Sequence, residues 1–105
     1  MAETPTGFYH NVYFWAADAS AAAKIAEGCA KHLAGIPGVL RLNLGKPAGT
    51  DRAVVDNSYG VALLVEFADR AAHDVYQDHA DHHAFIDECK AYWTKVQVYD
   101  SLPFG

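Results

Sequence analysis

Basic residues are scarce in this sequence. Lysine and arginine together account for eight of the 105 residues, against thirteen aspartates and glutamates, and the formal net charge is −5. These few basic residues are scattered along the chain, whereas a nucleic-acid-binding protein gathers them in a stripe that neutralises phosphates. We therefore expect no nucleic-acid partner.

A long apolar run and a leader segment are also missing. No run approaches the ~20 apolar residues that a membrane-spanning helix needs, and the opening "MAETPTGFYH" lacks the positive start and apolar segment of a signal peptide. The two cysteines, Cys29 and Cys89, do not have the spacing of a disulfide framework. We expect them to be free buried thiols, and we expect a cytoplasmic protein with no membrane partner.

Aromatic and β-branched residues are concentrated in "FYHNVYFWA" (8–16), which predicts a strand. Period-two alternation gives a strand two faces. One face carries His10, Val12 and Phe14, and the other carries Tyr9, Asn11, Tyr13 and Trp15. Because both faces hold aromatic side chains, we expect both to be at least partly buried.

Three more strands and two helical regions follow. Alternating apolar residues predict strands at 38–47, 59–67 and 95–101. An alanine-rich stretch predicts a helix that begins at Asp18 or Ser20. The second helical region is expected in two pieces that separate near His79. In the strand at 59–67, one face is formed by Tyr59, Val61, Leu63, Val65 and Phe67.

The resulting order, β-α-β-β-α-β, is that of the split βαβ, or ferredoxin-like, α+β fold. It predicts a single domain over residues 1–105, with a four-stranded antiparallel sheet in the strand order 4-1-3-2 and both helical regions on one face. The opposite face then carries apolar side chains, which are Tyr9, Tyr13, Trp15, Val39, Leu64 and Tyr99. A monomer does not leave so much apolar surface in water, so we expect a homodimer whose two sheets face each other as a dimeric α/β barrel.

The segment "VYQDHADHHAF" packs three histidines into five positions. In a continuous helix, Tyr76, His79 and His83 would share one face, and His82 would point about 100° away from His83. Which of the two neighbouring histidines turns toward the sheet therefore depends on the break near His79.

A metal site is a second interpretation of this segment. His79 and His83 have the i, i+4 spacing that can ligate a divalent ion, with Asp78 or Asp81 nearby. A closed zinc site needs three or four convergent ligands, and the two carboxylates point elsewhere on a helix. We therefore predict no metal site, and we expect His83, like His73, to be solvated.

The strand order places two polar residues side by side. His10 opens the first strand and Asp100 ends the last one, and these strands are antiparallel neighbours. By alternation both residues lie on the face that the helices cover. A carboxylate beside an imidazole fixes its tautomer and raises its basicity. The pair either has a catalytic role or simply joins the first strand to the last.

Five segments of the chain carry a resemblance to a known family. They are "FYHNVYF" at the start, "LAGIPGVLRLNLG" (33–45), "YGVALLVEF" (59–67), "YQDHADHHAF" (76–85) and "YWTKVQVYDS" (92–101). In this order and spacing they resemble the stress-responsive A/B barrel family, also called the Dabb or dimeric α/β-barrel family, from His10 to Asp100. The resemblance implies the ferredoxin-like homodimer, whereas most members of the family have no assigned activity.

One member of that family is a plant polyketide cyclase, which closes a linear tetraketide by an aldol condensation with a tyrosine and a histidine. The resemblance matches this catalytic pair to Tyr76 and His82, and it matches supporting residues to His10 and Asp100. It implies that His82 removes a proton from a carbon next to a carbonyl while Tyr76 donates to the developing enolate oxygen. A further pocket histidine of the cyclase is replaced here by Val61, which removes a polar contact.

Three functional classes remain open. The first is a binding protein without turnover, whose pocket between helices and sheet takes a small carbonyl-bearing or aromatic molecule. The second is a lyase of the polyketide-cyclase type that uses His82 and Tyr76 as an acid–base pair. The third is a cofactor-free monooxygenase of the related antibiotic-biosynthesis type. None of the three requires a cofactor, and we predict none.

Overall fold

Strands and helical regions follow one another in the predicted order over residues 7–105, which are the part of the chain that the computed structural model describes. In chain order the elements are β1 (Phe8–Ala16), α1 (Ala19–His32), β2 (Arg41–Gly45), β3 (Val61–Phe67), α2 (Arg70–Asp78), α3 (Ala80–Cys89) and β4 (Trp93–Ser101). The second helical region is divided into α2 and α3, as the sequence predicts. Within residues 7–105, no helix combines the length and the apolar character needed to cross a bilayer.

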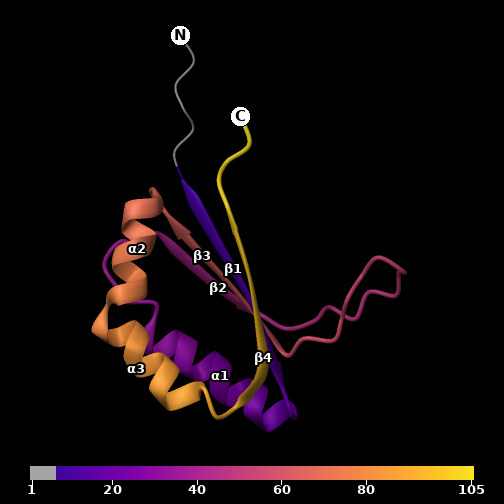
Figure 1. Ribbon diagram of the computed structural model, residues 1–105. Coiled ribbons are helices and arrows are strands. Elements are labelled where there is room, and N and C mark those ends of the chain that lie inside the picture. The colour runs from indigo at the N-terminus through magenta and orange to yellow at the C-terminus, as the bar shows by residue number, and fades with distance from the viewer. Residues whose placement is uncertain (1–6) are drawn as a thin grey trace.

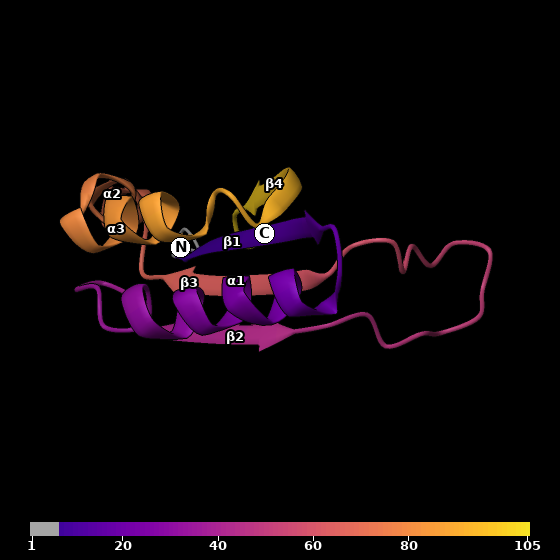
Figure 2. The same cartoon turned by 90° about the horizontal axis from the view of Figure 1, so that it is seen from below.

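The four strands form one antiparallel sheet in the order β2-β3-β1-β4, which confirms the predicted order 4-1-3-2 and the ferredoxin-like fold. Strand β1 is central and pairs with β3 on one side and β4 on the other. The three helices cover one face of the sheet (Figure 1). The connection between β2 and β3, residues 46–60, projects away from the helices at one end of the sheet (Figure 2).

The core lies between the helices and the sheet face that carries His10, Val12 and Phe14. Buried and half-buried side chains alternate along β1 and β3, which confirms the period-two pattern of both strands. The buried apolar residues of the sheet are Phe8, Val12, Phe14, Val61, Leu63, Val65 and Phe67; those of the helices and the turn after α1 are Ile25, Cys29, Leu33, Ile36, Tyr76, Phe85 and Cys89. Among the described residues, His10 is the one buried polar side chain.

Side-chain caps set the helix boundaries. At the start of α1, Asp18 accepts a hydrogen bond of 2.8 Å from the backbone N–H of Ala21. Between α2 and α3, His79 has an extended backbone, and its Nδ1 accepts a bond of 3.0 Å from the N–H of Asp81. Because the helix is interrupted here, His82 lies on the same inward side as Tyr76 and contacts its ring, whereas His83 is exposed.

The uncovered face of the sheet is aromatic, with Tyr13 at its centre. The Tyr13 ring lies 5.0 Å from that of Tyr59 and 6.1 Å from that of Tyr99, centroid to centroid. Trp15 lies 6.5 Å from Tyr59 on the same face. The prediction that Tyr59 shares a face with Val61 is therefore wrong, because β3 begins only at Val61 and the alternation does not extend back to Tyr59.

Val39 is the second residue whose predicted face is wrong. It packs against the core instead of lying on the uncovered face. The reason is that β2 begins only at Arg41, so Val39 still belongs to the turn after α1, where its N–H donates to the carbonyl of Ile36 at 3.2 Å.

Both thiols are free and buried, as the sequence predicts. Burial raises the pKa of Cys29 to about 12, and the neighbouring Cys89 raises it further in the same direction. Burial also raises the pKa of Cys89. At neutral pH both residues are therefore neutral thiols that pack as small apolar side chains.

Candidate functional site

The predicted pair of His10 and Asp100 is formed. The two residues face each other across the β1–β4 ladder, and Nδ1 of His10 lies 2.6 Å from Oδ1 of Asp100. The imidazole is 6% exposed, whereas the carboxylate at the sheet edge is 39% exposed. Burial lowers the pKa of His10 below its ordinary value, although Asp100 opposes this effect. His10 is therefore a neutral imidazole at neutral pH, held in one tautomer by the carboxylate.

Tyr76 and His82 come together across the break between α2 and α3. Tyr76 is fully buried near the end of α2, and its ring lies 4.9 Å from the His82 ring in an edge-to-face arrangement. The same tyrosine ring contacts Phe67 at 5.0 Å and His10 at 5.8 Å. The structure thus brings three of the four predicted site residues into one cluster, with Asp100 behind His10.

His82 carries an unusual polar atom. Its Nδ1 is buried and has no hydrogen-bond partner within residues 7–105. Burial lowers the pKa of His82 to about 4, and the neighbouring His10, His83 and His73 lower it in the same direction. Burial also raises the pKa of Tyr76 above its usual range. At neutral pH the pair consists of an uncharged imidazole and an uncharged phenol.

A pocket of about 170 Å³ opens beside this cluster, between the helices and the sheet. Most of its lining is apolar, from β1, β3, β4, α3 and the turn after α1. Its polar lining residues are His10, Tyr76, Gln77 and His82. An apolar cavity with a few convergent polar groups is the usual character of a small-molecule site.

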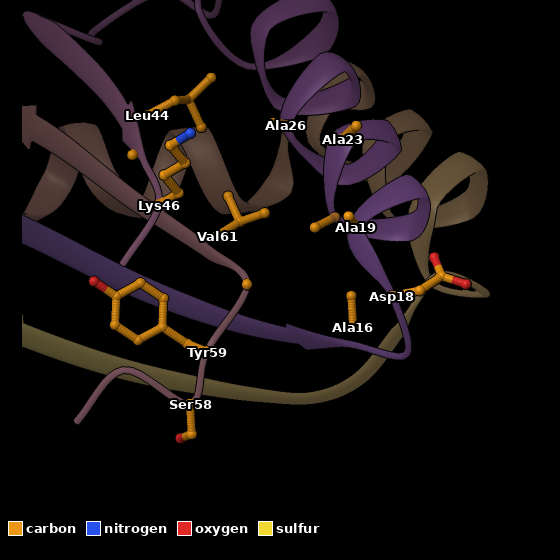
Figure 3. Close-up of a pocket in the computed structure, with 13 residues that line it drawn as sticks. Ala16, Asp18, Ala19, Ala23, Ala26, Leu44, Lys46, Ser58, Tyr59 and Val61 are labelled. Carbon is orange, nitrogen blue, oxygen red and sulfur yellow. The ribbon is translucent and has the colours of Figure 1, made fainter. Parts of the chain in front are cut away.

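A larger hollow, of about 680 Å³, lies between α1 and the adjoining ends of β2 and β3 (Figure 3). Alanine side chains of α1 face Leu44, Lys46 and Val61 across it (Figure 3). Among the described residues its lining offers no imidazole, and its carboxylate, Asp18, already caps α1. Despite its size, this hollow lacks the imidazoles that distinguish the smaller pocket.

His73 is a site residue that the sequence-based prediction missed. It is predicted to be solvated, but its side chain is only 12% exposed. Its ring stacks on Phe8 with centroids 4.3 Å apart, and its Nε2 lies 3.2 Å from Nε2 of Gln77. The sequence signal was available, because His73, Tyr76 and Gln77 are spaced i, i+3 and i+4 and so lie on one helical face.

The other predicted histidines do not converge. His83 is exposed, as predicted. His79 uses its Nδ1 to cap α3. Because the helix breaks at His79, these two residues do not have the continuous i, i+4 geometry that a shared metal ion would need.

A family model supports the architecture. Residues 8–102 match the model described as "Stress responsive A/B Barrel Domain". No curated protein matches this chain significantly in sequence.

Solved structures with the same fold cover nearly the whole chain. A Dabb family protein with a ferredoxin-like fold from Mesorhizobium loti is 28% identical, with a TM-score of 0.78 over 95% of this chain and 99% of that chain. A dimeric ferredoxin-like protein of unknown function from Thermobifida fusca is 18% identical, with a TM-score of 0.73 over 98% of this chain and 96% of that chain. A hydroxynitrile lyase from Passiflora edulis is 16% identical, with a TM-score of 0.77 over 96% of each chain. The last two likenesses, at such low identity, concern the fold alone.

Proposed function

The chain belongs to the stress-responsive A/B barrel domain family, and on that premise we propose that it binds a small carbonyl-bearing or aromatic molecule in the pocket at His82. The observation that carries the proposal is the unpartnered Nδ1 of His82. A buried polar atom without a hydrogen bond costs about 1–3 kcal/mol. A ligand that supplies the missing bond recovers this free energy.

The pocket limits the size of that ligand. A protein cavity of roughly 150 Å³ holds one benzene ring, so a pocket of about 170 Å³ fits one ring with a small substituent. The apolar walls, which include Phe14, Leu63 and Val98, suit the ring. A hydroxyl or carbonyl substituent suits the imidazole, which accepts or donates at Nδ1 according to its tautomer.

An acid–base lyase is the second candidate, favoured by the contact between Tyr76 and His82. In this mechanism His82 takes a proton from the substrate and Tyr76 donates to the oxygen that gains charge. The fold likeness to a hydroxynitrile lyase is compatible with it. However, a pKa of about 4 makes His82 a weak base at neutral pH, and each unit of pKa corresponds to about 1.4 kcal/mol. Binding without turnover is therefore the primary proposal.

We also propose that residues 1–105 act as one domain that pairs with a second copy through the uncovered sheet face. This face exposes Tyr99, which is 60% exposed, beside Tyr13 and Tyr59. The relative from Thermobifida fusca is described as dimeric. A second identical sheet would cover these aromatic side chains by a two-fold symmetric interface.

A cytoplasmic location is proposed from the thiols. Cys29 and Cys89 are both free, and a reducing compartment keeps thiols in this state. Fractionation of the cells that make the protein, with detection by antibody, tests the location.

Ligand titration tests the binding proposal. Phenol, benzaldehyde and benzene share one ring, but only the first two carry a polar group for Nδ1 of His82. We expect the wild type to bind phenol or benzaldehyde at least tenfold more tightly than benzene in calorimetric titrations. Binding of benzaldehyde reports the tautomer, since its carbonyl only accepts a hydrogen bond and needs a proton on Nδ1, whereas the hydroxyl of phenol can donate or accept.

Two variants provide the comparison. His82→Leu keeps the pocket apolar and removes Nδ1, so it should bind all three compounds with similar affinity. His83→Leu changes an exposed histidine one position away and should behave as the wild type. Equal affinity of the wild type for benzene and its polar analogues would overturn the proposal. Consumption of a bound aldehyde, followed by chromatography, would favour the lyase, and oxygen uptake with an electron-rich aromatic compound would favour the monooxygenase.

A further inference from the structure

Two imidazoles converge on the amide of Gln77. Nε2 of His73 lies 3.2 Å and Nε2 of His10 lies 3.4 Å from the same Nε2 atom of this side chain. The two imidazole rings are 5.0 Å apart, centroid to centroid. One residue comes from the central strand and the other from α2, so the arrangement exists only in the folded chain.

A carboxylate lies beside the other ring nitrogen, Nδ1, of each imidazole. Nδ1 of His10 lies 2.6 Å from Asp100, and Nδ1 of His73 lies 3.2 Å from Asp74. A carboxylate accepts a hydrogen bond from Nδ1–H and so leaves the lone pair on Nε2. Both lone pairs then point toward the Gln77 amide. The same carboxylate–imidazole arrangement supports histidine ligands in metal sites.

We propose that His10, His73 and Gln77 form a binding site for one divalent transition-metal ion. His10 and His73 belong, with Asp100, to a group whose possible ligand atoms lie within 4.8 Å of one another. In the proposed site Asp100 orients His10 through Nδ1 and is not itself a ligand. Rotation of the Gln77 amide presents its oxygen in place of its NH2 group, and water completes the coordination. Imidazole ligands select ions such as Zn²⁺, Co²⁺ and Ni²⁺ over Mg²⁺ and Ca²⁺.

The surroundings hold the two imidazoles in place. His10 is buried on β1, and His73 is stacked on Phe8 with 23° between the ring planes. Asp100 and Asp74, which contact the outer nitrogen of each ring, are 39% and 62% exposed. A preformed pair of ligands with satisfied supporting hydrogen bonds is what a metal site requires.

The metal site and the ligand pocket share His10 and Gln77, but the two proposals rest on different observations. His82, whose unpartnered Nδ1 carries the proposed function, takes no part in the metal site. His73 and Asp74 do not line the pocket. Failure of one proposal therefore leaves the other standing, provided that each is tested with the other site empty.

Titration of the tag-free, chelator-treated protein with Co²⁺ tests the metal site. We expect one Co²⁺ per chain, and we expect the histidine proton resonances of His10 and His73 to be lost through paramagnetic broadening while those of His32 persist. His73→Phe keeps an aromatic ring on Phe8 and removes the ligand, so it should weaken binding at least 100-fold. Asp100→Asn removes only the support of His10 and should weaken binding about 10–100-fold.

His83→Phe is the matched control, because it replaces an exposed histidine outside the cluster and should bind Co²⁺ as the wild type does. Circular dichroism confirms that each variant is folded. Three results would overturn the proposal: no binding at millimolar Co²⁺, unchanged affinity in His73→Phe, or broadening confined to His79 and His83. In each of these cases Gln77 only joins the two imidazoles by hydrogen bonds.

Discussion

Nδ1 of His10, near the start of β1, lies 2.6 Å from Oδ1 of Asp100, near the end of β4. A hydrogen bond this short is typical of an ionised acceptor. It joins β1 to β4 beside the pocket, and the same His10 ring lies close to the Tyr76 ring and the Gln77 amide. The stability of the sheet and the tautomer of His10 therefore depend on one carboxylate.

Asp100→Ala should lower the free energy of unfolding by about 1–3 kcal/mol, because it leaves the buried Nδ1–H of His10 without an acceptor. Urea denaturation followed by fluorescence measures this change. Asp51→Ala, in the exposed connection between β2 and β3, should change the stability by no more than about 0.5 kcal/mol. Equal effects of the two substitutions would contradict a structural role for the pair.

Acidification should destabilise the protein partly through His82. Its pKa is about 4 when folded and 6.5 when unfolded, so the unfolded chain binds the proton more tightly. The contribution of His82 is fully present above pH ~6.5 and is lost as the pH falls toward ~4, by on the order of 2–3 kcal/mol.

Urea denaturation at several pH values, in the presence of a chelator, measures this dependence. His82→Leu should show a smaller loss of stability between pH 6.5 and pH 4 than the wild type does. His10 titrates in the same direction and remains in both proteins, so the difference between them isolates His82. Identical pH profiles would show that the ring is not desolvated.

Gly28→Ala should destabilise the chain even though alanine favours helices. A Cβ atom at this position would lie 2.3 Å from Sγ of Cys89, where α1 packs against α3. Overpacking of this kind costs about 1–3 kcal/mol, which exceeds the roughly 1 kcal/mol that alanine gains over glycine in a helix. Thermal unfolding measures the net loss.

Cys89→Ala in the Gly28→Ala background should restore part of that stability, because it removes the clashing sulfur. Gly35→Ala is the control, since nothing lies within 4 Å of its added Cβ. A double-mutant cycle without coupling between positions 28 and 89 would contradict the predicted clash.

Leu64→Asp should convert the proposed dimer into a monomer. Leu64 lies on the uncovered face of β3, between Asn11 of β1 and Asn43 of β2, so the substitution places a charge on the surface that the second sheet would cover. Analytical ultracentrifugation at micromolar concentration distinguishes the two states. Val75→Asp adds the same charge at an exposed position of α2 and should remain dimeric. A wild type that sediments as a monomer would refute the proposed interface.

Much of the fold was predictable from alternation in β1 and β3. Each strand has one fully buried face, so the apolar pattern determines both the face and the register. The predictions failed at Tyr59 and Val39, which lie just outside their strands. Alternation alone does not show where a strand begins, since the turn residues before it are also apolar.

The candidate site was predictable in part. The pairing of His10 with Asp100 follows from strand order, and the contact of Tyr76 with His82 follows from the resemblance to a known family. The i, i+3 spacing of His73 and Tyr76 indicates that His73 faces inward, but nothing in the local sequence indicates the aromatic ring on which it stacks. Phe8 is 65 residues away in sequence, and only the folded chain brings the two together.

The central position of β1 has a consequence for synthesis on the ribosome. Of the four strands β1 is synthesised first and its partner β4 last, and the paired His10 and Asp100 are 90 positions apart. A nascent chain therefore carries an aromatic strand with one open edge until β4 has been synthesised. A product truncated before β4 would keep that edge permanently, and quality-control chaperones or proteases would recognise it as unfinished.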